Sequence, residues 1–252
     1  MSDYNNKTAI ITGGGSGIGR QTALSLARKG ANVTIADISE EAGEESVRLI
    51  EELGRKAIFV KTDVSNLEDV KAYVKKTKET FGSIDMFFNN AGIEGKVTPL
   101  ADYPEDIFEK VVDINLKGAF YGLKYVIQEM LQNGGGAIVN TASNAALDGS
   151  PGVSPYSATK HSIVGLTKTA AGEYASQNIR VNAIAPGPTA TNMMDRFTQG
   201  SEEAADQVKS GIPANRYGTP EEVANLVTFL LGSDVNFTNG AVFPIDGGIT
   251  SV

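Results

Sequence analysis

The chain has 252 residues, a formal net charge of −8 and 41% hydrophobic residues, a balance that is ordinary for a globular protein. It has no cysteine and one histidine, which excludes disulfides, thiolate metal sites, cysteine nucleophiles and multi-histidine zinc sites. The acidic charge gives no general electrostatic reason to bind nucleic acid or an anionic membrane. No apolar run reaches the roughly 18 residues of a membrane helix, and the first residues lack the pattern of a secretion signal. We therefore expect a cytoplasmic protein without a bound metal.

Short apolar runs alternate with amphipathic stretches of helical length along the chain. The runs predict strands at residues 8–12, 33–36, 57–60, 84–88, 137–140, 179–184 and 241–245. The stretches between them predict helices at about 17–29, 40–53, 66–80, 105–132, 155–176 and 220–231. Because several strands are almost continuously apolar, we expect them to be covered on both faces. The pattern predicts a single α/β domain over residues 1–252, a Rossmann-type, doubly wound, seven-stranded parallel sheet flanked by helices.

Two predicted helices begin with the spacing of a capping box. Ser65 and Glu68 have this spacing before the third helix, and Thr219 and Glu222 have it before the last one. Between the last two strands, the segment at about 186–219 has no clear strand and is too long for an ordinary loop. We expect it to form a lid or a substrate-binding segment.

The first predicted strand runs into a glycine-rich turn, Thr12-Gly13-Gly14-Gly15-Ser16-Gly17-Ile18-Gly19. Glycines at such a turn let the backbone approach a pyrophosphate, and the free N–H groups of the following helix bind the anion. The strict G-x-G-x-x-G pattern is absent, and the glycines at 13, 17 and 19 follow a T-G-x-x-x-G-x-G spacing. Tight turns also collect glycine, but the order strand, turn and helix favours a dinucleotide site.

Asp37 ends the second predicted strand. A carboxylate at this place accepts hydrogen bonds from the adenosine ribose and repels a 2′-phosphate, which favours NAD(H) over NADP(H). Ile38 carries no positive charge that could bind a 2′-phosphate. Arg20, just past the glycine turn, carries one, so NADP(H) stays an alternative cofactor. The alternative is that Asp37 caps the next helix, a role for which Ser39 competes.

Tyr156 and Lys160 are four residues apart on a predicted helix and therefore project from the same face. A free tyrosine has a pKa of about 10, and a nearby ammonium favours the phenolate. Lowering this pKa to near 7 requires roughly 4 kcal/mol, which the lysine and an oxidised nicotinamide could supply together. A tyrosine and a lysine four residues apart are common on helices. The pair therefore indicates an active site only when other site residues accompany it. Ser143 follows the fifth predicted strand, near the carboxyl edge of the sheet where ligands bind.

With these residues the chain resembles the classical short-chain dehydrogenase/reductases over essentially its whole length. Each motif is short, but their joint order and spacing are specific. The motifs are Thr12-Gly13…Gly17-Ile18-Gly19, Asp63-Val64, Asn89-Asn90-Ala91-Gly92, Asn115, Ser143, Tyr156…Lys160, Pro186-Gly187 with Thr191, and Asp246-Gly247-Gly248.

The resemblance implies an NAD(H)-dependent oxidoreductase that interconverts a secondary alcohol and a ketone. It implies that Tyr156 is the general acid/base and that Lys160 lowers its pKa and binds the nicotinamide ribose. Ser143 would hold the substrate oxygen, and Asn115 would support a water on a proton path. Cofactor binding is implied for Tyr156 and Lys160 and for Gly13, Ser16, Gly17, Ile18, Gly19, Asp37, Asp63, Val64, Asn89, Ala91, Gly92, Pro186, Gly187, Thr189 and Thr191.

The residues expected near the substrate are mainly apolar, which favours a small to medium alcohol or ketone over a polar sugar. Those in the lid segment are open to a second interpretation, since they could simply pack the lid. The expected substrate residues are Ala145, Leu147, Val153, Met193, Met194 and Phe197.

Two other functions stay open. Reductases of 3-oxoacyl groups on acyl-carrier protein typically have basic residues near the site, but the corresponding stretches 128–133 and 175–178 lack arginine. A chain with net charge −8 would also steer an acidic carrier poorly. A third possible function is that of a non-catalytic protein that binds NAD, although Asn115, Ser143, Tyr156 and Lys160 are all present. The resemblance further implies a homotetramer or a homodimer that pairs the long helices 105–132 and 155–176.

Overall fold

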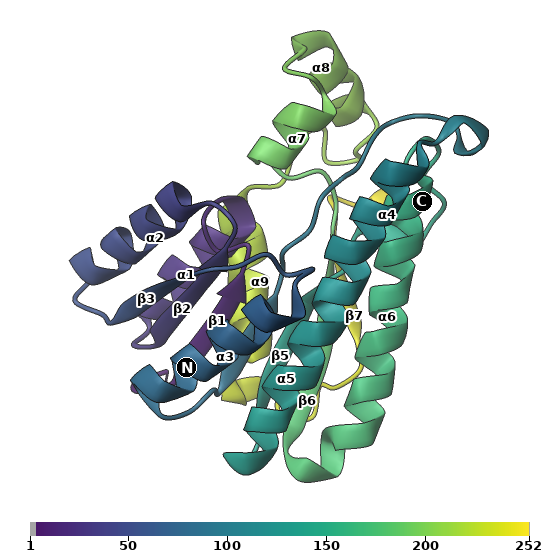
Figure 1. Ribbon diagram of the computed structural model, residues 1–252. Coiled ribbons are helices and arrows are strands. Elements are labelled where there is room, and N and C mark those ends of the chain that lie inside the picture. The colour runs from purple at the N-terminus through teal and green to yellow at the C-terminus, as the bar shows by residue number, and fades with distance from the viewer. Residues whose placement is uncertain (1–3, 252) are drawn as a thin grey trace.

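The computed structural model describes residues 4–251, so residues 1–3 and 252 of the predicted domain lie outside the described residues. Within residues 4–251, one seven-stranded sheet has the order β3-β2-β1-β4-β5-β6-β7, and every neighbouring pair is parallel (Figure 1). This confirms the predicted doubly wound sheet. The strands are β1 Thr8–Thr12, β2 Asn32–Asp37, β3 Ala57–Lys61, β4 Met86–Asn89, β5 Gly136–Thr141, β6 Ile179–Pro186 and β7 Val242–Ile245.

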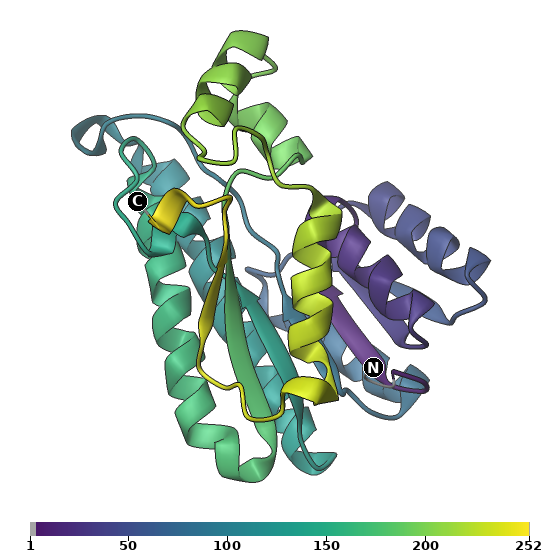
Figure 2. The same ribbon diagram turned by 180° about the vertical axis from the view of Figure 1, so that it is seen from behind.

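Helices cover both faces of the sheet, as Figures 1 and 2 show from opposite sides. Neighbouring residues of a strand point to opposite faces, so Phe87 and Phe88 of β4 are both fully buried but belong to different apolar clusters. None of the described helices is both long and apolar enough to cross a membrane. One face carries α1 Gly17–Arg28, α2 Glu40–Glu52 and α9 Pro220–Leu231, and the other carries α3 Leu67–Phe81, α5 Ala119–Gln132 and α6 Ser154–Tyr174.

The long helix predicted at 105–132 is interrupted. It consists of α4 Glu105–Val112, a π-helical turn Asp113–Gly118 and α5. A π turn inserts an extra residue into the helix, is rare, and is frequently found at functional sites. Asn115, a predicted site residue, lies within it and is buried.

The predicted capping box before α3 is wrong. The helix begins one residue later, where Oδ1 of Asn66 accepts a hydrogen bond from the Glu68 backbone N–H at 2.9 Å. The hydroxyl of Ser65 instead donates to a carboxylate of the preceding loop at 2.6 Å, so it is not available to the helix. The box before α9 is confirmed, because the Glu222 N–H donates to Thr219 Oγ1 at 3.2 Å and the Thr219 N–H donates to Glu222 Oε2 at 2.8 Å.

The segment at 186–219 contains two short helices, α7 Asn192–Phe197 and α8 Glu202–Ser210. They lie beyond the carboxyl ends of the strands, at the top of Figure 1. The two ends of the segment meet in a parallel bridge between Thr189 and Gly218, where the Gly218 N–H donates to the Pro188 carbonyl at 3.0 Å. The two ends of the segment are thus bonded to each other, and its helices extend from there. They lie over the carboxyl edge of the sheet, where the sequence motifs are found.

Candidate active site

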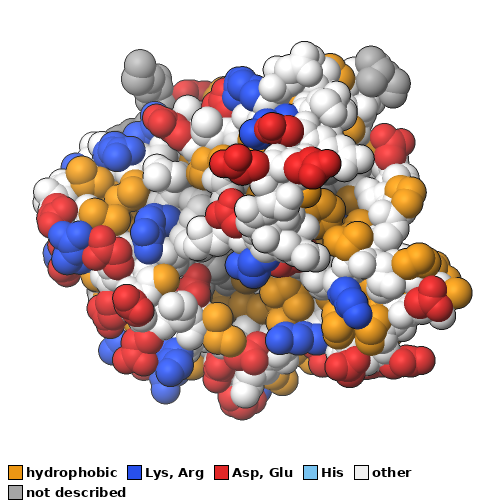
Figure 3. Space-filling model, turned by 90° about the horizontal axis from the view of Figure 1, so that it is seen from above, with side chains coloured by type: hydrophobic (Ala, Val, Ile, Leu, Met, Phe, Trp, Pro, Cys, Tyr) orange, Lys and Arg blue, Asp and Glu red, His pale blue; other side chains and the backbone are white. Residues whose placement is uncertain are grey.

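A cavity of about 840 Å³ opens at the carboxyl ends of the strands, beneath the segment 186–219. Figure 3 shows this end of the molecule, where hydrophobic side chains gather around a hollow in the surface. The carboxyl ends of parallel strands and the loops that follow them are the usual ligand site of such folds. One continuous cavity is lined by the glycine turn after β1, the loops after β4, β5 and β6, and residues of α6 and α7.

The glycine turn has a backbone that only glycine tolerates well. Gly13 and Gly17 have φ angles of +63° and +49°, in the left-handed region. A Cβ on Gly19 would lie 2.1 Å from the Gly13 carbonyl oxygen, so α1 could not approach the turn as closely. In the described structure, Ser16 at the start of α1 makes no side-chain capping bond and the first turn of the helix holds no acidic residue. The N–H groups of this helix start are thus open to an anion, which fits the pyrophosphate of a dinucleotide.

Asp37 lines the cavity at the end of β2, while Arg20 turns away from it. The Asp37 carboxylate accepts hydrogen bonds from the N–H groups of Gly15 at 2.8 Å and Ser39 at 2.9 Å. Ser39, not Asp37, is the N-cap of α2. Arg20 Nε donates to Ser46 Oγ of α2 at 2.9 Å. The negative charge therefore faces this part of the cavity and the nearby positive charge does not.

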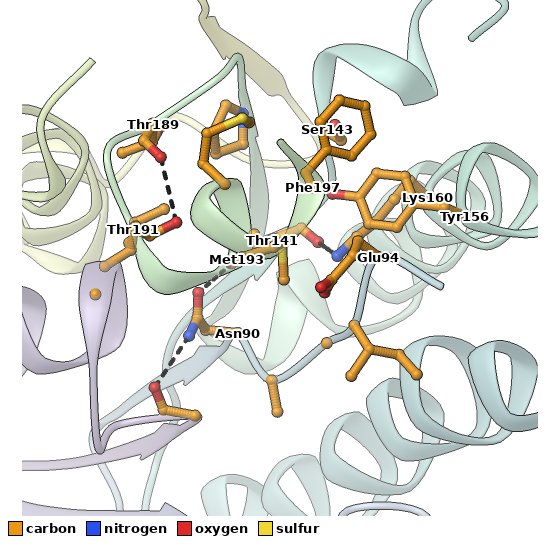
Figure 4. A pocket seen from close by; sticks show the side chains of 18 of the residues that line it. Asn90, Glu94, Thr141, Ser143, Tyr156, Lys160, Thr189, Thr191, Met193 and Phe197 are labelled. Atoms are coloured by element: carbon orange, nitrogen blue, oxygen red, sulfur yellow. Dashed lines mark hydrogen bonds between the residues drawn. The ribbon is translucent and has the colours of Figure 1, made fainter. Parts of the chain in front are cut away.

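Asn90 ties three segments together at the middle of the cavity (Figure 4). Its Nδ2 donates to the Thr12 carbonyl at 3.1 Å, and its Oδ1 accepts from the Thr141 hydroxyl at 3.2 Å. The Thr12 hydroxyl in turn accepts from the N–H groups of Asn90 at 2.9 Å and Ala91 at 3.1 Å. These bonds hold the loop after β4 against the glycine turn and fix the floor of the cavity.

Tyr156 and Lys160 project from α6 into the cavity, as their spacing predicts (Figure 4). Lys160 Nζ lies 5.5 Å from the centre of the Tyr156 ring and donates a hydrogen bond to the Thr141 carbonyl at 2.8 Å. Burial lowers the pKa of Lys160 from 10.5 to about 8. Ser143, in the loop after β5, is buried and lines the same cavity.

The residues of the chain alone raise the pKa of Tyr156, whereas the lowering expected from the sequence also involves an oxidised nicotinamide. Burial of the phenol is the largest influence and raises this pKa, the hydrogen bond with Ser143 lowers it, and the negative charge of Glu94 raises it. Desolvation disfavours the phenolate, and among the residues of the chain itself it outweighs the favourable contacts. The residues of the chain alone therefore do not supply the lowering that the proposed chemistry needs.

Asn115 acts through its side chain on the loop after β4. Its Oδ1 accepts from the Ile93 N–H at 2.8 Å, and its Nδ2 donates to the Ile93 carbonyl at 2.9 Å. A Cβ on Gly92 would lie 3.1 Å from Asn115 Oδ1 and 3.5 Å from Lys160 Nζ. The glycine therefore lets the loop pass closely between the π turn and the lysine.

Comparison with known proteins agrees with this geometry. Residues 13–250 match a family model described as Enoyl-(Acyl carrier protein) reductase. Cyclohexanol dehydrogenase of Acinetobacter sp. (strain SE19) is 45% identical over 98% of this chain and 96% of its own. Levodione reductase of Leifsonia aquatica is 44% identical over 97% of this chain and 94% of its own. The chain belongs to the short-chain dehydrogenase/reductase family.

Two solved structures match this fold over nearly the whole chain. The crystal structure of levodione reductase has a TM-score of 0.97 at 42% identity and covers 99% of both chains. The crystal structure of NAD+-bound xylitol dehydrogenase has a TM-score of 0.93 at 40% identity and covers 97% of this chain and 99% of its own. The resemblance read from the motifs is confirmed.

Most of the predicted site residues of this short-chain dehydrogenase/reductase line the cavity. Four described residues do not: Gly19 and Asn115 act through the packing and bonds given above, Asn89 donates to Asn140 Oδ1 at 3.1 Å between two strands, and Leu147 lies on the surface. The predicted residues that line the cavity are Gly13, Ser16, Gly17, Ile18, Asp37, Asp63, Val64, Ala91, Gly92, Ser143, Ala145, Val153, Tyr156, Lys160, Pro186, Gly187, Thr189, Thr191, Met193, Met194 and Phe197.

Three charged lining residues are missing from the sequence prediction, and one of them is Lys110 of α4. Glu94 follows the Asn89–Gly92 motif closely, and Arg196 belongs to α7. Their side chains form an ion pair in which Arg196 Nε lies 2.7 Å from Glu94 Oε1. The only signal in the sequence is that Glu94 directly extends the motif loop.

Proposed function

We propose that the chain is an NAD(H)-dependent oxidoreductase that interconverts a secondary alcohol and a ketone, with Tyr156 as general acid/base. The observation that carries this proposal is a single cavity in which Tyr156, Lys160 and Ser143 lie beyond a glycine turn with an open helix N-terminus. Relatives that are 45% and 44% identical are named as a dehydrogenase of cyclohexanol and a reductase of levodione. A neighbouring structure is described as NAD+-bound.

Each residue of the proposed active site has its own role in the reaction. Bound NAD(H) supplies or accepts the hydride. The Ser143 hydroxyl donates to the substrate oxygen and holds it beside the phenol. Tyr156 donates its proton to the developing alkoxide during reduction and takes a proton from the alcohol during oxidation. The Lys160 ammonium stabilises the phenolate, and two of its three N–H groups remain for the nicotinamide ribose and water.

The cofactor choice is part of the proposal. Asp37 presents a carboxylate where the adenosine ribose would lie, and the exposed Ile38 beside it carries no charge. Arg20 is hydrogen-bonded to α2 and does not face this space. A 2′-phosphate would therefore meet a negative charge without a compensating positive one, which supports NAD(H) over NADP(H).

Reduction of a 3-oxoacyl group on acyl-carrier protein is the second candidate. The description of the matching family model, Enoyl-(Acyl carrier protein) reductase, names the same carrier but a different reduction, so it supports only the carrier. The net charge of −8 opposes the approach of an acidic carrier. Comparing the rates on a carrier-bound 3-oxoacyl thioester and a small cyclic ketone separates the two candidates.

Assembly into a homotetramer or homodimer, in the cytoplasm, completes the proposal. Phe108 of α4 and Phe120 of α5 are 44% and 46% exposed, and Phe229 of α9 is 53% exposed. Large apolar side chains on two helical faces support association of copies through those faces. A single monomeric species in sedimentation velocity would contradict this part.

The experiment that tests the function replaces Tyr156 by phenylalanine. We expect kcat for NADH-dependent reduction of cyclohexanone to fall by roughly 10³-fold, because the acid/base hydroxyl is removed. NADH affinity, measured by fluorescence titration, should stay within about twofold. Tyr174→Phe at the far end of α6 is the matched control and should keep wild-type kcat. Normal turnover by Tyr156→Phe would show that the proposed mechanism is wrong.

A further inference from the structure

Glu94 places a carboxylate in the wall of the cavity. Its side chain is 17% exposed, and the lining nearby includes Ile93, Val153, Met193 and Phe197. In Figure 4 Glu94 points into the cavity on the side of Tyr156. A charge that is largely removed from water needs polar partners, so the question is which partners this carboxylate has.

Arg196 of α7 is the partner that the structure gives. Its Nε lies 2.7 Å from Glu94 Oε1 and its Nη2 lies 3.1 Å from Oε2, a two-pronged pairing of guanidinium and carboxylate. Within residues 4–251, no other hydrogen bond or ion pair joins α7 or α8 to a residue outside 186–219. The pair therefore spans the cavity from the loop after β4 to the segment above it.

The pair keeps unused hydrogen-bonding capacity. A guanidinium has five N–H groups and a carboxylate about four acceptor positions, and the pairing uses only two of each. The Arg196 side chain is 57% exposed, so the ion pair itself adds little to stability. A structural role alone thus gives a weak account of a carboxylate at this position.

The position of Glu94 relative to the reacting atoms is fixed by the backbone. Both backbone groups of the preceding residue, Ile93, are bonded to the Asn115 side chain on the π turn. The carboxylate is near enough to Tyr156 for its charge to raise the pKa of the phenol. Glu94, Tyr156 and Ser143 line the same cavity (Figure 4), so one substrate molecule can contact Glu94 while its reacting oxygen is held at Tyr156 and Ser143.

We propose that Glu94 and Arg196 form a polar subsite for a second oxygen of the substrate. The enzyme then prefers compact, mainly apolar alcohols and ketones that carry a further hydroxyl or carbonyl group over those with one oxygen. Glu94 accepts a hydrogen bond from a second hydroxyl, and the remaining N–H groups of Arg196 donate to a hydroxyl or carbonyl oxygen. This inference rests on the proposed function, since it places the second oxygen relative to the carbon that Tyr156 serves.

The test compares cyclohexanol with the cyclohexane-1,2-, 1,3- and 1,4-diols as NAD+-dependent substrates. We expect kcat/KM for the preferred diol to exceed that for cyclohexanol by roughly tenfold or more, the value of a hydrogen bond to a charged group. Glu94→Gln keeps the size of the side chain and removes its charge, and Arg196→Gln removes the partner. Each should reduce the ratio of diol to cyclohexanol by roughly tenfold.

Arg216→Gln is the matched control. Arg216 forms the other two-pronged ion pair of the segment 186–219, with Glu222 of α9, and does not line the cavity. Its variant should keep the wild-type ratio. Equal losses for diol and cyclohexanol in Glu94→Gln would mean that the pair only holds the segment in place, and would overturn the subsite. Wild-type inactivity on cyclohexanol and all three diols would instead overturn the proposed function, and the subsite with it.

Discussion

Lys160 is a buried charge that the proposed chemistry needs and the fold does not. The residue is 4% exposed, and burial lowers the pKa of its ammonium group from 10.5 to about 8. The unfolded chain therefore binds this proton more tightly than the folded chain does. The difference corresponds to a destabilisation of the folded protein by about 3 kcal/mol at pH 7.

Replacing Lys160 by methionine should stabilise the cofactor-free protein. Methionine keeps most of the apolar stem and removes the charge. The substitution also removes the hydrogen bond to the Thr141 carbonyl, at 2.8 Å, and the unpaired carbonyl costs about 1 kcal/mol. We expect the free energy of unfolding at pH 7 to rise by about 2 kcal/mol.

The stability that Lys160→Met gains over the wild type should decrease as the pH rises. Below about pH 8 the lysine is charged in both states, and the full destabilisation is present. Between about 8 and 10.5 the folded protein loses the proton first, so the stability of the wild type rises with pH. Above 10.5 the lysine is neutral in both states, so the advantage of the variant should be gone.

Urea unfolding followed by circular dichroism at pH 7 and pH 10 measures both effects. Lys168→Met is the control, because Lys168 is an exposed residue of the same helix, and its variant should stay within about 0.5 kcal/mol of the wild type. Lys160→Met should also lose at least about 10²-fold in kcat. A variant that is less stable than the wild type at pH 7 would refute the reasoning that desolvation dominates at this position.

Three further substitutions test separate parts of the structure. Asp37→Ala removes the carboxylate at the adenosine end, so the ratio of kcat/KM with NAD+ to that with NADP+ should fall at least about tenfold; an unchanged ratio in parallel assays would contradict its role. Gly19→Ala places a Cβ 2.1 Å from the Gly13 carbonyl and should weaken NADH binding at least about tenfold in fluorescence titrations. Tyr73→Phe removes a fully buried hydroxyl that has no hydrogen-bond partner among the described residues, and should raise the melting temperature by about 2–4 °C. A lower melting temperature would contradict that.

The fold follows from short-range patterns because parallel sheets leave a strong signal in the sequence. A strand buried on both faces must be apolar at consecutive positions, as Phe87 and Phe88 are, and each crossover needs a helix of sufficient length. The π turn around Asn115 leaves no such signal. Its apolar residues continue the spacing of an ordinary helix, and the extra residue is stabilised by contacts of Asn115 with Ile93, which belongs to another part of the chain.

The candidate site also contains features that the sequence predicts and features that it does not predict. Tyr156 and Lys160 are predictable as neighbours, because a helix fixes the relation of residues four apart. The sign of the Tyr156 pKa shift is not, because it depends on how much water the fold removes and on the charge of Glu94. Glu94 and Arg196 are 102 residues apart, the first on the loop after β4 and the second on the short helix α7. Spacing therefore predicts which groups carry the reaction, whereas the groups proposed to select its substrate emerge only when these two segments are placed in space.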